Sequence, residues 1–490
     1  MSLLDNLLAL WDSSMDAFPQ RRTAFRARRI ALGLLGCLGR HTLTGAICAT
    51  GRQDEDWSAD YRLFSQSPWS QTDLFASVVT GILDRLAPGL PFVAALDDTR
   101  LPKTGTKIPG ASRGRDPLSP PFHVNLIWAQ RFLQVSGFVR DGETAAPARS
   151  IPVRYCHAPA VAKPKRSAPP EAWKAYEVER RRDNLSTRAV GALRELREDL
   201  DRRQAADRRL IVTVDGGYTN QTVLKSPLER TTLIGRIRKD AKLFYPPAPA
   251  TAAVKGRPRR YGAQAPTPEQ LRRDDSIPWQ EVRAFAAGRT HDFRVKTMGP
   301  VLWPKAGSDK PLQVMVVAPL SYRPRKGSPL LYRQPAYLIC QDLTLPAETF
   351  LQYYLWHWGI EVNHRDEKQI VGVGEAQVRS PLSADRQPAF AVGCYSMLLL
   401  AGIQTFGLTT TQTVSVLPKW RAGRPGSQPC TQDLLQRLRG EIWADALDAL
   451  SRAEAAAGTF AHFVCTDPHA TKPEKIAMPL SSAVMNCRTG

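Results

Sequence analysis

The stretch "RRLIVTVDGGYTN", residues 208–220, joins a short apolar run to an aspartate. Residues 210–214 are apolar or β-branched, which is typical of a buried strand. Asp215 follows directly, and the two glycines after it indicate a turn. A carboxylate at a strand end sits on a rigid support, so Asp215 is a candidate catalytic group or metal ligand. The same residues also fit an ordinary strand followed by a glycine turn.

A second stretch repeats this pattern. "PFVAALDDT", residues 91–99, is a short apolar strand that ends in Asp97 and Asp98. Either aspartate could instead form a simple turn or cap a helix. If the two strands lie side by side, their terminal carboxylates converge on one point. Such a group of oxygen ligands suits Mg²⁺.

A third acid lies in "YYLWHWGIEVNHRDEK", residues 353–368, within a predicted helix. Glu361 could be a solvated residue on the helix surface. Together with the two strand-end aspartates, it completes a set of three carboxylates that could hold two metal ions for an in-line phosphoryl displacement. A zinc site is an alternative, because His357, Glu361 and His364 share one helix face. Their spacing differs from that of HExxH zinc enzymes.

The chain is long and strongly basic. It has 490 residues, enough for two to four domains, and a formal net charge of +21. This excess favours a polyanionic partner, either nucleic acid or an acidic membrane surface. The apolar run at residues 389–408 contains polar residues and is predicted to be a core helix, so no membrane partner is expected. The eight cysteines form no CxxC pair and are predicted to be reduced thiols of a cytoplasmic protein.

Changes in residue pattern divide the chain into five segments. Strands are expected at residues 91–99, 122–130 and 131–139, and a long charged helix at about 171–208. Helices return at residue 346 and continue to about 408, with a further helix near 431–456. The five segments are a helical N-terminal DNA-binding region (1–85), the first part of an α/β core (86–224), a β-rich insertion (225–345), the second part of the core with the Glu361 helix (346–412) and a C-terminal region (413–490).

Three stretches of the sequence resemble the DDE transposases of bacterial insertion sequences, specifically those with the YREK signature. Tyr354, His357, Glu361 and Lys368 have the spacing of that signature, with histidine in place of the usual arginine. "LDDTRLPKTG" at 96–105 is similar to the first aspartate segment of the family, and "VTVDGGYTN" at 212–220 to the second. The three motifs also follow the family's order.

The resemblance implies an α/β fold with an RNase H-like mixed-sheet catalytic core. A mostly β insertion would interrupt this core, and helical regions would stand at the N-terminal and C-terminal ends. Asp97, Asp215 and Glu361 would be the catalytic metal ligands for Mg²⁺, with Mn²⁺ as a substitute. Asp98 is the adjacent alternative to Asp97, which we prefer because it stands two residues before Thr99, as the family's aspartate does.

The implied activity is cleavage of DNA at transposon ends and strand transfer into target DNA, by a homodimer in a synaptic complex. The enzyme would be cytoplasmic and associated with the bacterial nucleoid when bound to DNA. Two alternatives remain. One is a metal-dependent nuclease of the same fold, and the other is a catalytically inactive DNA-binding protein derived from a transposase.

The resemblance also implies DNA contacts around the catalytic site. Tyr354 and Lys368 would contact phosphates near the transposon end. His357 is a weaker candidate, because a neutral imidazole cannot replace a permanently charged arginine. Further basic clusters could bind phosphates or simply be solvated, and one of them contains Lys163, Lys165 and Arg166. The clusters that we predict to bind DNA contain Arg236, Arg238, Lys239, Arg257, Arg259 and Arg260.

Overall fold

The computed structural model describes residues 1–116, 119–120, 122–142, 146–203, 205–226, 228–248, 259–323, 327–410, 414 and 428–456. The chain forms two compact units. Unit 1 comprises Met1–Val78, Leu101–Gln130 and His364–Gly490, and unit 2 comprises Val79–Arg100 and Arg131–Asn363. Strands β1 (Phe92–Pro102) and β3 (Leu126–Arg140) and helix α12 (Trp358–Gln369) contain residues of both units.

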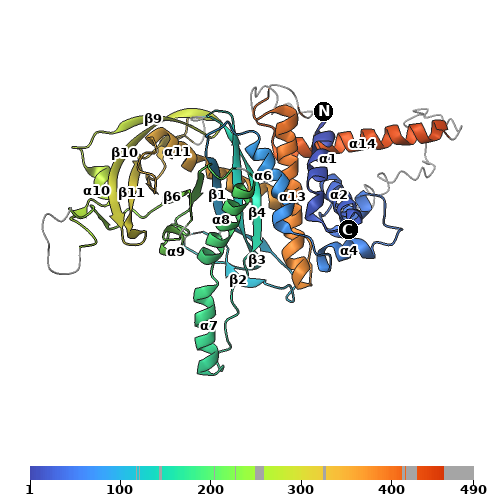
Figure 1. The fold of residues 1–490 in the computed structure, drawn as a ribbon, viewed down its shortest axis with the longest axis horizontal. Helices are drawn as coiled ribbons and strands as arrows, with labels where there is room; N and C mark the ends of the chain where they lie inside the picture. The colour runs from blue at the N-terminus through green and yellow to red at the C-terminus, as the bar shows by residue number, and fades with distance from the viewer. Residues whose placement is uncertain are drawn as a thin grey trace. The chain divides into compact units, whose positions relative to one another are not determined.

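Unit 1 is mainly helical (Figure 1), as predicted for the N-terminal region. It contains the short strand β2 (Ser112–Arg115) and the beginning of helix α6 (Ala76–Leu83). Its other helices are α1 (Leu3–Ser13), a 3-10 turn (Met15–Ala17), α2 (Arg21–Gly36), α3 (Leu43–Ala49), α4 (Ser58–Ser65), α5 (Gln71–Leu74), α13 (Pro381–Phe406) and α14 (Thr431–Ala456).

Helix α13 forms the centre of unit 1. The ring of Phe390 lies 5.7 Å from Trp11 of α1 and 5.3 Å from Phe64 of α4, measured between ring centroids. Trp69 adds a third ring at 6.0 Å. By length and hydropathy α13 could cross a membrane, yet 83% of its apolar window is buried inside the protein. The prediction of a core helix is therefore confirmed.

Unit 2 is built on a large mixed sheet. Within unit 2 the sheet follows the order β3-β1-β5-β6-β14-β11-β10-β7-β8, with β4 paired to β3 and β9 paired to β10. Strand β2 pairs with the first residues of β3, which belong to unit 1. This architecture confirms the predicted α/β class and is compatible with an RNase H-like core. Its remaining strands are β4 (Ala148–His157), β5 (Leu210–Val214), β6 (Thr231–Arg236), β7 (Leu243–Phe244), β8 (Gln264–Ala265), β9 (Gln280–Ala286), β10 (Arg289–Trp303), β11 (Gly307–Val317) and β14 (Ala336–Cys340). A separate ribbon pairs β12 (Ser321–Tyr322) with β13 (Leu331–Tyr332).

Three parallel strands, β1, β5 and β6, form the middle of this sheet. Helices α11 (Ala347–Trp356) and α12 bring apolar side chains to a core cluster shared with these strands, among them Phe350, Trp356 and Ile360. The other helices of unit 2 are α7 (Pro170–Arg182), α8 (Leu185–Arg202), α9 (Gln221–Leu224) and α10 (Pro268–Arg273). In the segment predicted to be rich in strands, residues 225–345, the described part contains β6 to β14 and, as its only helix, the short α10.

Several predicted elements have different bounds in the structure. The two strands expected at 122–130 and 131–139 are wrong, because no turn residue separates them and they form the single strand β3. Strand β4, which pairs antiparallel with β3, was not predicted. The long helix expected at 171–208 is also wrong. It is divided into α7 and α8 at Asn184, whose side chain accepts hydrogen bonds from the first turn of α8.

Candidate metal centre

Strand alternation places Asp97 on the face of β1 that α11 and α12 cover. Successive side chains of a strand point to opposite faces, so Val93, Ala95 and Asp97 share one face. Val93 and Ala95 belong to the core cluster that also contains Ile360 of α12. Asp97 therefore continues the covered face just beyond its apolar part, while Asp98 belongs to the opposite face.

The two neighbouring strands end in the same way. The register pairs Leu96 with Val214 and Val214 with Gly235. Asp97, Asp215 and Arg236 consequently occupy the next position on three adjacent parallel strands, which lie about 4.8 Å apart from one neighbour to the next. Two carboxylates and one guanidinium are thus presented in a row at one edge of the sheet.

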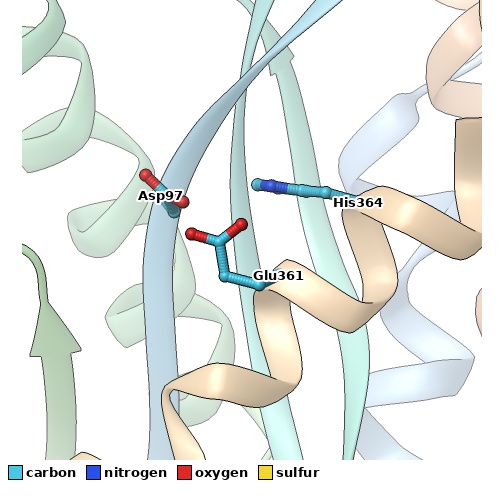
Figure 2. A group of neighbouring side chains, drawn as sticks. All are labelled: Asp97, Glu361 and His364. Atoms are coloured by element: carbon cyan, nitrogen blue, oxygen red, sulfur yellow. The ribbon is translucent and has the colours of Figure 1, made fainter. Parts of the chain in front are cut away.

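Glu361 reaches this edge from helix α12, immediately after the buried Ile360. A carboxylate oxygen of Asp97 lies within 4.8 Å of a carboxylate oxygen of Glu361. Figure 2 shows the two carboxylates pointing toward one another, with His364 one turn further along the same helix. The imidazole of His364 is a third potential ligand of this group. The helical spacing in the sequence indicates His364 only as part of a zinc site with His357 and Glu361.

The carboxyl group of Asp97 has an unusual charge environment. Burial, and then the charges of Glu361, Asp98 and Asp215, raise the pKa of Asp97 to about 8. The backbone N–H of Asp98 acts in the opposite direction by donating a 2.8 Å hydrogen bond to Asp97 Oδ1. Crowded carboxylates repel one another unless a cation neutralises them. The abundance of oxygen donors fits a hard divalent cation such as Mg²⁺ or Mn²⁺.

Asp215 is exposed and fixed by the turn that follows it. Its Oδ1 accepts hydrogen bonds from the backbone N–H groups of Gly217 at 2.9 Å and Tyr218 at 3.1 Å. A Cβ atom at Gly217 would lie 3.2 Å from that oxygen, so the tight turn favours glycine. In the described part of the chain, Asp215 is not among the ligand atoms within 4.8 Å of one another. Its charge nevertheless acts on Asp97.

Asp98 is engaged by two residues that sequence reasoning missed. The Tyr218 hydroxyl donates a 2.7 Å hydrogen bond to Asp98 Oδ1, and Arg131 Nε forms an ion pair with Oδ2 at 2.9 Å. Burial, and then the charge of Asp98, raise the pKa of the Tyr218 phenol, which keeps its proton for this bond. Both oxygens of Asp98 therefore have partners, which supports Asp97 as the ligand. In the sequence, the position of Tyr218 three residues after Asp215 is the feature that indicates a place near the site.

Tyr354 and Arg236 lie together beside the strand ends. Burial raises the pKa of the Tyr354 phenol, and the Arg236 guanidinium beside it acts in the opposite direction. The Tyr354 ring stacks on His357 with 6.2 Å between ring centroids. His357 Nδ1 lies 3.1 Å from the hydroxyl of Thr213 on β5. Burial lowers the pKa of His357, against the charge of Asp215, so the ring stays neutral at neutral pH. A cationic phosphate contact through His357 therefore has no support here.

The other residues predicted to bind DNA are dispersed. Arg238 and Lys239 are exposed after β6, and Arg238 pairs with Asp240 at 2.9 Å. Arg259 and Arg260 are exposed, whereas Arg257 lies outside the described residues. Lys368 is half-buried in the last turn of α12. The geometry thus brings Arg236 and Tyr354 near the candidate centre and leaves the remaining contacts as predictions.

One comparison with known proteins agrees with the first aspartate motif. The sequence model of a family described as DDE superfamily endonuclease matches residues 15–120. This match contains Asp97 and ends before Asp215 and Glu361. It supports a DDE-type transposase, while the YREK subtype stays a prediction because the signature lies outside the matched residues. No curated protein matches the chain.

Proposed function

We propose that this chain, similar over its first quarter to the DDE endonucleases, is a transposase. It would cleave DNA at the ends of a mobile element and join the freed ends to target DNA. The convergence of Asp97 on β1 and Glu361 on α12 carries the proposal, because it creates a carboxylate pair at the edge of the sheet. The net charge of +21 supports DNA as the substrate.

Asp97, Asp215 and Glu361 are the residues that would hold the metal. A bound divalent cation such as Mg²⁺ would supply Lewis-acid stabilisation of the phosphoryl group and a more acidic attacking water. The turn after β5 holds Asp215 in one orientation through two backbone N–H groups. Tyr218 and Arg131 contact the two carboxylate oxygens of Asp98, so Asp98 would not serve as a metal ligand.

Arg236 and Tyr354 would bind the scissile strand. Arg236 follows Gly235 at the end of β6, next to the position of Asp215, so its guanidinium can pair with a phosphate beside the carboxylates. The Tyr354 hydroxyl next to it can donate to the same phosphate group. The neutral His357 supports the Tyr354 ring by stacking, so we assign it a positioning role.

A plasmid assay tests the proposal. Candidate ends, taken from the DNA that flanks the gene, are placed on a supercoiled plasmid, and Mg²⁺-dependent cleavage and joining are measured. The wild type and the control Glu281→Gln, which changes an exposed glutamate of β9, should cleave and join. Glu361→Gln should bind the ends and do neither.

The outcomes separate the alternatives. Cleavage without joining by the wild type would support a nuclease of the same fold. Binding by the wild type and Glu361→Gln with no cleavage by either would support the inactive DNA-binding protein. A fully active Glu361→Gln variant would overturn the assignment of the metal centre.

A further inference from the structure

Helix α7 has a property that is unusual for a helix in a folded protein: none of its 13 residues is buried. The next helix, α8, buries one complete face, including Leu193, Leu196 and Leu200. Figure 1 shows α7 and the chain segment before it extending away from α8 and β4 of the same unit. Isolated helices of this length are marginally stable in water. A contact with a partner would therefore add to the stability of α7.

The surface of this projection is cationic. We call residues 161–182 the basic finger. It contains seven lysines and arginines against three glutamates. All seven cations are exposed, and only Arg181, among these described residues, has a carboxylate within 4.0 Å. That pair, with Glu177 at 3.9 Å, is solvated and therefore weak. The cations are Lys163, Lys165, Arg166, Lys174, Arg180, Arg181 and Arg182.

The segment before α7 packs along the helix. Lys163 Nζ lies 5.6 Å from the centroid of the Trp173 ring, and Trp173 and Tyr176 are 6.1 Å apart in an edge-to-face arrangement. Arg180 Cζ lies 5.7 Å from the Tyr176 ring. These contacts order Lys163 and Arg180, two of the seven cations, so that their binding costs less conformational entropy.

The base of the finger is fixed to unit 2. Arg188 of α8 donates to both carboxylate oxygens of Asp183, at 2.6 and 2.5 Å, and to the His157 carbonyl oxygen at 2.8 Å. The Asn184 side chain caps α8 at the same place. The joint between α7 and α8 is therefore held by charge-assisted hydrogen bonds, which are among the stronger ones in proteins.

We propose that the basic finger binds the phosphate backbone of duplex DNA, separately from the metal centre; this inference rests on the proposed function. Helix α7 is about 20 Å long. This length is close to half a turn of DNA, where successive phosphate charges are about 1.7 Å apart along the axis. A second copy of the chain is a poorer partner, because it carries the same strong positive charge.

The test removes finger charges without touching the aromatic contacts. The finger variant combines Lys165→Gln, Arg166→Gln, Lys174→Gln and Arg181→Gln. The control removes four exposed cations of the β-rich segment by Arg283→Gln, Arg289→Gln, Lys305→Gln and Arg333→Gln. Binding of a duplex that carries the element end is measured by fluorescence anisotropy across a salt series, and cleavage is measured at saturating DNA.

The expected result is a change in salt dependence. Each lost phosphate contact reduces the magnitude of the negative slope of log K against log salt by about 0.9. The slope of the finger variant, which lacks four cations, should therefore be smaller in magnitude by up to about 3.6. The control should keep the wild-type slope, and cleavage at saturation should persist in both variants. An unchanged slope in the finger variant would overturn the inference. If sedimentation also showed loss of a dimer, the partner of the finger would be a second copy of the chain. A wild type that binds no DNA would instead defeat the proposed function.

Discussion

Tyr218 donates a 2.7 Å hydrogen bond to the carboxylate of Asp98, and this bond ties the turn after β5 to β1. The two strands carry Asp215 and Asp97 at equivalent positions. Asp98 also pairs with Arg131 of β3, so three strands are connected at the edge where the carboxylates meet. The relative positions of Asp97 and Asp215 thus depend on neighbours that bind no metal themselves.

Tyr218→Phe should therefore weaken metal binding without removing a ligand. A hydrogen bond to a charged group contributes about 1.5–3 kcal/mol, and loss of such supporting bonds lowers metal affinity about 10- to 100-fold. We expect the Mg²⁺ concentration for half-maximal cleavage to rise by about tenfold, with activity recovered at high Mg²⁺. Tyr245→Phe, at an exposed tyrosine, is the matched control. Equal Mg²⁺ dependence in both variants would refute the positioning role.

His357→Gln should leave the salt dependence of DNA binding unchanged. Burial lowers the pKa of His357, so its neutral ring adds no charge to a phosphate contact. Because the folded protein holds this proton more weakly than the unfolded chain, stability should fall as the pH drops below about 6.5. Thermal unfolding of the wild type between pH 8 and 5 should show this loss, and the variant should show less of it. A salt slope of smaller magnitude in the variant would instead support a phosphate contact through His357.

The position of the candidate centre along the chain could be predicted from the sequence. Both strand-end aspartates follow short apolar runs, and the Glu361 helix begins where strand patterns stop. These features are local, so a single sequence contains them. Residues 92–96 are apolar on both faces of β1, so only the fold shows that α11 and α12 cover the face of Val93, Ala95 and Asp97.

Contacts between distant segments could not be predicted. Arg131 reaches Asp98 from another strand, and no periodicity of the chain indicates that pair. The orientation of Asp215 depends on the turn that its own carboxylate stabilises. Similarly, the charge pattern of residues 171–208 is typical of one solvated helix, and only the fold shows that α8 is packed while α7 is not.

Glu269 of α10 can be used to test how hydrogen bonds to a carboxylate stabilise the β-rich segment. Arg272 donates to its carboxylate at 2.9 and 2.7 Å, Arg273 at 2.7 Å and the Tyr337 hydroxyl at 2.5 Å. Hydrogen bonds from Arg272, and then from Tyr337 and Arg273, lower the pKa of Glu269 against the effect of burial. The stabilisation is present above the unfolded pKa, about 4.5, and is lost as the pH falls below it.

Glu269→Gln should therefore unfold at a lower temperature near pH 7 and show a smaller difference from the wild type near pH 3. Each ~1 kcal/mol of lost stability corresponds to about 2–4 °C for a domain of 150–250 residues. Scanning calorimetry at both pH values measures this difference. Glu281→Gln serves as the control, and a pH-independent difference for Glu269→Gln would contradict the ionic origin of the effect.

Asp97→Asn should make the metal-free protein more stable and abolish its response to metal. The pKa of Asp97 is raised to about 8, so near pH 7 folding of the metal-free protein requires this carboxyl group to take up a proton or to keep its charge near Glu361, Asp98 and Asp215. Asparagine avoids both costs. A ligand that binds only the folded state raises the unfolding temperature with its concentration. Mg²⁺ or Mn²⁺ should therefore stabilise the wild type, whereas the variant should start higher and respond little. Equal stabilisation of both proteins by Mn²⁺ would show that the metal binds elsewhere.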